Sequence, residues 1–183
     1  MPDNDDLLFF GRVSASVSHE LKNVLAVINE QAGLLEDLAG LAGRGMPLDP
    51  DRLATAAACL LRQVRRGDAI IGHLNRFAHT ADTPRREVSL AETAGLAASL
   101  GQRQAAMRQV TLTAIPGTDA TVETSPFGLC RLLSVYLERA MAAPDASKCI
   151  SVTVEVGEGG PALVVTGLAQ EVLAADDAPG QAL

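Results

Sequence analysis

Aromatic side chains are scarce in this chain of 183 residues, which has no tryptophan, one tyrosine and four phenylalanines. A core must therefore be built mainly from small and aliphatic side chains, and alanine and leucine, the most abundant of these, favour helices. Because 48% of the residues are hydrophobic, the chain is still long and apolar enough to bury a core. We expect a mainly helical first half.

Cysteine is also rare, and the three that occur lie far apart, at Cys59, Cys130 and Cys149. None has the close pairing of a zinc or redox motif. Each lies beside apolar residues, so we expect buried, reduced thiols, as in a cytoplasmic protein.

Positive charge is in the minority, since the formal net charge is -7. A nucleic-acid surface needs clustered Lys and Arg on one face, so nucleic acid is not an expected partner. Only Arg62, Arg65 and Arg66 cluster, and a solvated helix face explains them as well as a docking patch does.

The first residues do not have the pattern expected of a signal peptide, and the sequence has no long apolar run. Its first ten residues are acidic where a signal peptide is basic, and no run approaches the roughly 20 apolar residues that cross a bilayer. These absences predict a cytoplasmic protein that does not enter a membrane. If the chain is complete, we expect no sensory domain before Leu7.

Two long helices are predicted in the first 80 residues. Residues 7–41 contain no proline and follow acidic capping residues, and residues 50–79 begin with Asp49 and Pro50, a good N-cap followed by a proline at the first helical position. The segment 43–50 between them is a turn. The apolar seams are predicted at Phe10, Val17, Leu21, Val24, Ile28, Leu35 and Leu38 and at Leu53, Ala57, Leu60, Val64, Ile71 and Leu74.

Each predicted helix carries further apolar residues outside its seam, namely Leu25 and Val27 on the first and Leu61, Ile70 and Phe77 on the second. One hairpin cannot cover all of them. We therefore expect a homodimer in which two hairpins form a four-helix bundle.

The second half has a different periodicity. We expect a linker at 81–86, then helices at 90–107 and 126–142 and strands at 110–114, 120–123, 149–156 and 162–166. The fold class is α+β, with a helical-hairpin domain at 1–80 and a small α/β sandwich at 87–183. A short helix is expected from Leu168, before a frayed tail.

The sequence SVSHELKNVL places His19 and Glu20 inside the first helix. At 100° per residue His19 lies about 200° from Val17 and faces solvent, whereas Asn23 lies roughly 40° from His19 on the same side. A neutral imidazole with one free nitrogen is a nucleophile, and a carboxylate such as Glu20 at its other nitrogen fixes the tautomer. A surface His beside a surface Glu is the plainer interpretation.

A zinc site is the other chemistry that His-Glu on a helix suggests. The H-E-x-x-H pattern needs a second His four residues on, but that position is Asn23. We therefore expect no metal ligand here.

The segment FFGRVSASVSHELKNVLAVINE resembles the H-box of the dimerisation and phosphoacceptor domain of two-component sensor histidine kinases. Phe10, Val17, Ser18, His19, Glu20, Leu21, Asn23 and Leu25 fit its pattern, and Val24 stands where the family usually has proline. The resemblance implies that His19 is the phosphoacceptor, that Glu20 orients and activates it, and that Asn23 positions water when such domains act as phosphatases. It also implies a homodimer that docks a response-regulator receiver domain.

The second half resembles the kinases' ATP-binding domain in element order, with SPFGLCRLLSVYLERAMAA similar to its N-box helix. The family's Mg²⁺-binding Asn aligns with Arg139, where a cation would repel the metal. The Asp-x-Gly-x-Gly turn that reads adenine is also missing after PALVVTG. We therefore expect a degenerate domain with no cofactor of its own, and Mg²⁺ only on the partner receiver.

An intact phosphoacceptor helix joined to a degenerate domain resembles the dimeric histidine phosphotransferases of phosphorelays. The expected function is relay of phosphate between receiver Asp residues through His19, with contacts from Asn29, Gln63 and Arg66. The alternatives are a receiver phosphatase that uses Asn23 and a non-catalytic adaptor that binds a receiver or kinase. An ATP-dependent autokinase is the weakest alternative.

Overall fold

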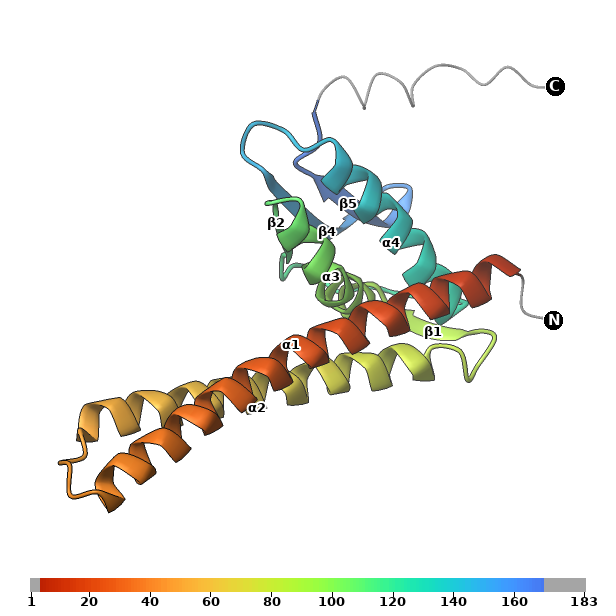
Figure 1. The fold of residues 1–183 in the computed structure, drawn as a ribbon. Coiled ribbons are helices and arrows are strands. Elements are labelled where there is room, and N and C mark those ends of the chain that lie inside the picture. The colour runs from red at the N-terminus through yellow and green to blue at the C-terminus, as the bar shows by residue number, and fades with distance from the viewer. Residues whose placement is uncertain (1–3, 170–183) are drawn as a thin grey trace. The chain divides into compact units, whose positions relative to one another are not determined.

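The structure, a computed structural model, describes residues 4–169 (Figure 1). The described chain forms two compact units, one of residues 10–75 and one that combines residues 4–9 with residues 76–169. They are called the hairpin unit and the α/β unit below. The first residues of the first helix, 4–9, and the last residues of the second helix, 76–79, thus belong to the α/β unit, whereas the sequence suggested a boundary near residue 80.

The two predicted helices are present as α1 (Asn4–Gly43) and α2 (Pro50–His79) (Figure 1). Gly45 has φ +82° in the turn between them, a conformation that glycine adopts without strain. The Asp49 carboxylate accepts a hydrogen bond from the backbone N–H of Asp51 at 2.9 Å. The predicted N-cap and the predicted turn are therefore confirmed.

The buried side of the hairpin differs from the predicted seams. On α1, Val17, Val24 and Leu38 are buried as expected, but Phe9 is buried in place of Phe10. On α2 the buried residues include Ala56, Ile70 and Phe77, whereas Ala57, Val64 and Ile71 of the predicted seam are exposed. A shift of one residue turns a helix by about 100°, and two adjacent apolar positions satisfy the same pattern.

Three of the four phenylalanines form one aromatic cluster in the α/β unit. The ring centroids of Phe9 and Phe77 lie 5.5 Å apart and those of Phe9 and Phe127 lie 5.7 Å apart, both edge-to-face. Phe77 is fully buried. Edge-to-face pairs stabilise beyond their apolar area, which explains why both ends of the hairpin belong to this unit.

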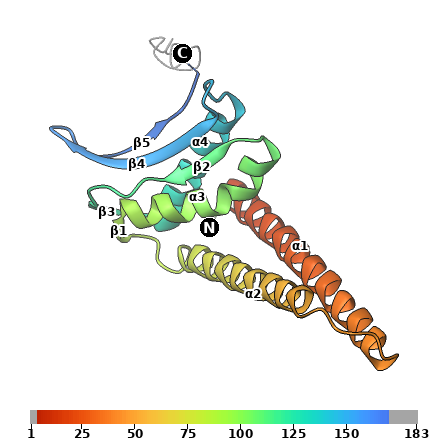
Figure 2. The ribbon, with the colours of Figure 1, turned by 90° about the vertical axis from the view of Figure 1, so that its left-hand side faces the viewer.

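The α/β unit contains two sheets. β1 (Arg86–Ser89) pairs antiparallel with β3 (Thr121–Thr124), and the second sheet has the order β2–β4–β5, with β2 (Thr111–Ala114) parallel to β4 (Cys149–Gly157) and β4 antiparallel to β5 (Gly160–Thr166). The helices α3 (Leu90–Met107) and α4 (Pro126–Ala142) pack against each other and against this sheet (Figure 2). The fold is α+β, as predicted.

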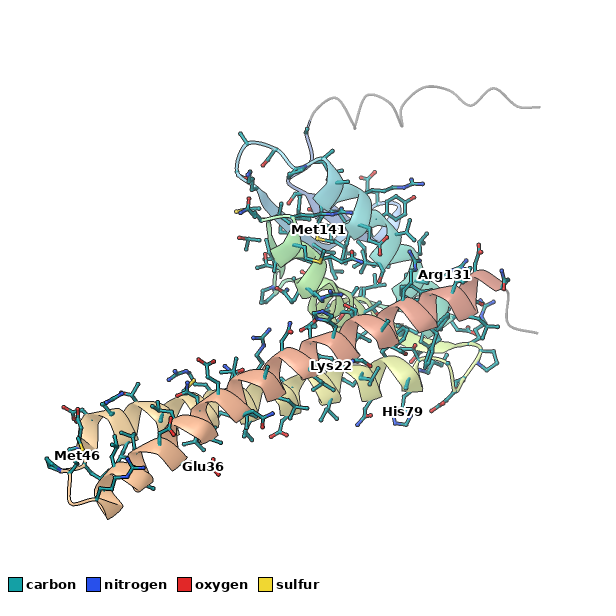
Figure 3. All side chains as sticks on the ribbon, in the orientation of Figure 1. Lys22, Glu36, Met46, His79, Arg131 and Met141 are labelled. Carbon is teal, nitrogen blue, oxygen red and sulfur yellow. The ribbon has the colours of Figure 1, made fainter. Side chains whose placement is uncertain are left out.

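The core of this unit lies between the two helices and the three-stranded sheet. Ile150, Val152 and Val154 alternate along β4 and are buried, as expected for a strand with one covered face. Met141 of α4, labelled in Figure 3, is 2% exposed and lies in this core. Leu137 and Cys130 of the same helix are also fully buried.

Side-chain caps explain where the two helices of this unit begin. Ser89 accepts a hydrogen bond from the N–H of Glu92, and Ser125 accepts one from the N–H of Gly128, just before Pro126. Asp119 accepts further hydrogen bonds from the Ser89 hydroxyl and the N–H of Ala91. These bonds hold the pKa of the Asp119 carboxyl below its usual value.

One strand of this unit was not predicted from the sequence. This strand, β1, begins at Arg86, the last residue of the predicted linker 81–86. The other predicted elements of this unit are confirmed within about two residues. The helix expected from Leu168 lies mostly outside the described residues.

The cysteines are all free thiols, but they differ in burial. Cys130 is buried, Cys59 is half-buried, and Cys149 at the start of β4 is exposed. The expectation of buried thiols is therefore confirmed for Cys130 and wrong for Cys149, and Cys59 lies between the two. Burial raises the pKa of the Cys130 thiol to about 12. Within residues 4–169, no helix combines the length and apolar content needed to cross a membrane.

Candidate functional site

His19, Glu20 and Asn23 lie on α1, which continues without a break through all three positions. His19 and Asn23 are exposed, and Glu20 is half-buried. Because four residues advance a helix by about 400°, the His19 and Asn23 side chains leave α1 roughly 40° apart. The structure thus presents an imidazole and an amide together on an accessible helix face.

Two buried valines set the rotation of α1 at this site. Val17 is 5% exposed and Val24 is 3% exposed, and both lie on the inner face of the hairpin. A position two residues after Val17 is turned by about 200°, so His19 points away from that inner face. The apolar positions of the hairpin therefore decide that His19 is accessible.

A glycine on α2 lets the two helices approach beside the site. A Cβ atom at Gly67 would lie 3.6 Å from Cγ1 of Val24, and Gly67 itself is buried. Small residues at a helix contact allow close packing of backbones. The segment of α1 that carries Asn23 thus packs closely against α2 at Gly67.

The charges close to His19 in the sequence are mixed. Glu20 follows it directly, and the exposed Lys22 of α1 (Figure 3) lies one residue before Asn23. An accessible imidazole can accept a phosphoryl group. A nearby ammonium group such as that of Lys22 can help to neutralise the negative charge of the phosphoryl group.

The three expected receiver contacts differ in accessibility. Asn29 on α1 and Arg66 on α2 are exposed, as a docking residue must be. Gln63 is half-buried and its Oε1 atom is shielded from solvent without a hydrogen-bond partner. A receiver contact at Gln63 requires an exposed side chain, but Gln63 lies on the inner face with Ala56 and Gly67.

The positions that resemble a nucleotide site lie in the α/β unit. Arg139, which takes the place of the family's metal-binding Asn, is exposed in the last turn of α4. After β5 comes Gly167, with φ +91°, whose Cβ, if it had one, would overlap the carbonyl of Cys149. Gly167 is thus a structural glycine at the end of a strand, and the segment beyond Ala169 lies outside the described residues.

No group of three or more His, Cys, Asp or Glu side chains that could hold a metal ion occurs within residues 4–169.

One feature of α4 was not recognised in the sequence. Besides its buried face, this helix exposes Leu132 and Tyr136, which are 54% and 49% exposed. The spacing of Leu129, Leu132 and Tyr136 at i, i+3 and i+7 marks a second apolar face. That spacing is visible in the sequence and was the available signal.

No family model and no curated protein matches this chain. Among solved structures it is similar to the Acinetobacter baumannii histidine kinase AdeS, with 14% sequence identity and a TM-score of 0.39. The matched region covers 84% of this chain and 76% of that one. A similarity of this size supports no conclusion about activity.

Proposed function

We propose that this protein is a histidine phosphotransferase that relays phosphate between Asp residues of response-regulator receiver domains through His19. The observation that carries the proposal is the accessible His19 on α1, with Glu20 beside it and Asn23 on the same face. The buried Val17 and Val24 hold this arrangement outward. A reaction with another protein needs an accessible nucleophile of this kind.

The transfer is a substitution at phosphorus. The free imidazole nitrogen of His19 forms the P–N bond while the P–O bond of the receiver's acyl phosphate breaks and the Asp carboxylate leaves. The proton on the other ring nitrogen stays there, and the Glu20 carboxylate offsets the positive charge of the phosphorylated ring. The reverse reaction with a second receiver completes the relay.

The phosphoryl donor in this proposal is a receiver and not ATP. The receiver supplies the Mg²⁺ and the Lys that neutralise charge in the transition state, so this chain needs only to position His19. Arg139 in the place of a metal-binding Asn favours this choice. The cytoplasmic location predicted from the sequence is where such partners act.

A homodimer is part of the proposal. Four large apolar side chains, Leu25, Leu61, Val64 and Ile71, are 57%, 58%, 49% and 46% exposed, and they are called the apolar stripe below. All four are turned in the same rotational sense from the inner faces of their helices, and in an antiparallel pair such positions lie on one side. A second hairpin packed on the stripe would complete a four-helix bundle.

The test is transfer of [³²P]phosphate to the purified chain from a panel of phosphorylated receivers and, separately, from [γ-³²P]ATP. We expect acid-labile label that arrives from a receiver and not from ATP. His19→Ala should lower the label at least about 100-fold, because it removes the nucleophile. His79→Ala is the matched control, since His79 is an exposed histidine of α2, and it should keep full transfer.

Each contrary result identifies another function. Label from ATP that depends on His19 would show an autokinase. Loss of phosphate from receivers that persists in His19→Ala but is lost in Asn23→Ala would show a phosphatase. A receiver that binds without either reaction would show an adaptor.

A further inference from the structure

An apolar pocket in the α/β unit lies between α4 and β5. Its volume is about 510 Å³, within the range of about 300–1,000 Å³ that is typical of small-molecule sites. α4 contributes Leu129, Leu132 and Tyr136, among others, and β5 contributes the alternate residues Pro161, Leu163 and Val165. The proposed relay makes no use of this pocket.

The pocket is accessible from solvent. Leu132 and Tyr136 are each about half exposed on α4, although large apolar side chains in the core of the same unit, such as Leu137, are fully buried. When an apolar molecule fills an apolar pocket that is open to water, apolar surface leaves the water and the free energy of the system falls.

Its charge is as distinctive as its shape. Among the described residues that line the pocket, Arg139 is the only charged one. A guanidinium group at an apolar site forms its strongest hydrogen bonds with a planar anion such as a carboxylate. The same arginine would repel a divalent metal ion, so the pocket is not suited to a metal-bound phosphate.

We propose that this pocket binds a small amphipathic carboxylate, with an aliphatic chain among the leucine and valine side chains and the carboxylate on Arg139. The aliphatic side chains that line the pocket suit the aliphatic chain of such a ligand. The hydroxyl of Tyr136, which also lines the pocket, can donate a second hydrogen bond to the carboxylate. This site is independent of His19, so its test and that of the relay can fail separately.

The sequence provides a built-in reporter for the test. Tyr136 is the only tyrosine and the chain has no tryptophan, so the intrinsic fluorescence arises from one residue in the pocket wall. Decanoate and the neutral decanol are the probes, titrated into the full chain below the concentrations at which either aggregates. We expect saturable changes in Tyr136 emission at one molecule per chain, with decanoate binding about tenfold more tightly, or about 1.4 kcal/mol.

Variants separate the charge from the apolar wall. Arg139→Gln should reduce the affinity for decanoate to that for decanol and leave decanol binding unchanged. Arg62→Gln, an exposed arginine of the hairpin unit, is the matched control and should change neither affinity. Circular dichroism of each variant checks that it is folded.

Several results would overturn the proposal. These are equal affinities for decanoate and decanol, no effect of Arg139→Gln, or displacement of decanoate by ATP with Mg²⁺. Shielding of Tyr136 from acrylamide without any ligand would show that the chain itself covers the pocket if it is independent of protein concentration. If that shielding grows with concentration, a second copy occupies the pocket instead.

Discussion

The hairpin unit and the α/β unit bury their apolar residues to different extents. The largest core side chains of the α/β unit, such as Leu137, Ile150 and Val152, are almost completely buried within one chain. In the hairpin unit, by contrast, the four residues of the apolar stripe are about half exposed. The comparison teaches that the α/β unit closes a core of its own although it also exposes Leu132 and Tyr136, whereas the buried apolar residues of the hairpin unit lie on one inner face and its apolar stripe is exposed.

The candidate functional features follow the same division. The hairpin unit carries His19, Glu20 and Asn23 on a helix whose rotation depends on a few buried valines. The α/β unit carries an apolar pocket on a well-packed scaffold. Four substitutions test how far this difference holds.

The largest expected effect is in the aromatic cluster of the α/β unit. Phe77→Ala should lower the free energy of unfolding by about 3–5 kcal/mol, because it leaves a cavity beside Phe9 and Phe127. Urea denaturation at two protein concentrations measures it. Leu8→Ala, which removes a side chain that is 58% exposed in the same unit, is the control and should cost within about 1 kcal/mol. Equal losses would contradict the assigned core.

The second effect concerns the apolar stripe. Ile71→Asp should weaken the proposed homodimer at least about 100-fold, because it places a charge in an apolar interface. Analytical ultracentrifugation over a dilution series measures the change. Ala69→Asp introduces the same charge at an exposed position outside the stripe and should leave the dimer intact. A wild-type chain that stays monomeric at all concentrations would refute the bundle.

A smaller gain in stability is expected at Gln63. Replacement by Leu should raise the free energy of unfolding by about 1 kcal/mol, because the shielded Oε1 has no hydrogen-bond partner. The exposed Arg66 offers the contrast, since Arg66→Ala should slow transfer from a receiver and change stability by less than about 0.5 kcal/mol. If Gln63→Leu slows transfer as strongly, Gln63 is a receiver contact after all.

The smallest effect is the pH dependence at Asp119. Its lowered pKa in the folded state means that the carboxylate stabilises the fold above the unfolded pKa, about 3.9, and that this contribution is lost as pH falls through the folded value. Asp119→Asn should remove this acid-dependent part of stability. Urea midpoints between about pH 6 and pH 2.5 compare the two chains, and parallel curves would show that the cap does not titrate.

The prediction from sequence was most accurate where local chemistry sets the structure. The start of α2 at Pro50 after the Asp49 cap was recognised from these two residues, and the helix predicted at 126–142 has the bounds of α4. The outward position of His19 was also predicted, because the two residues from Val17 to His19 turn the helix by about 200°. The roles of His19, Glu20 and Asn23 stay predictions.

Other features depend on contacts between distant residues. β1 pairs with β3, more than 30 residues away, and it follows charged residues and has Val88 as its one apolar side chain, so no apolar pattern marks it as a strand. The choice of Phe9 over Phe10 depends on the rings of Phe77 and Phe127. The inward position of Gln63 follows from the same kind of packing.

The sequence by itself determined the helices, their caps and the face of α1 that carries His19, because these depend on residues within a few turns of one another. Only the tertiary structure decided which apolar residues are buried in the hairpin, that both hairpin ends belong to the α/β unit, and that α4 and β5 enclose a pocket beside Arg139. The physical reason is that burial depends on packing partners far apart in the chain, and local periodicity does not name those partners.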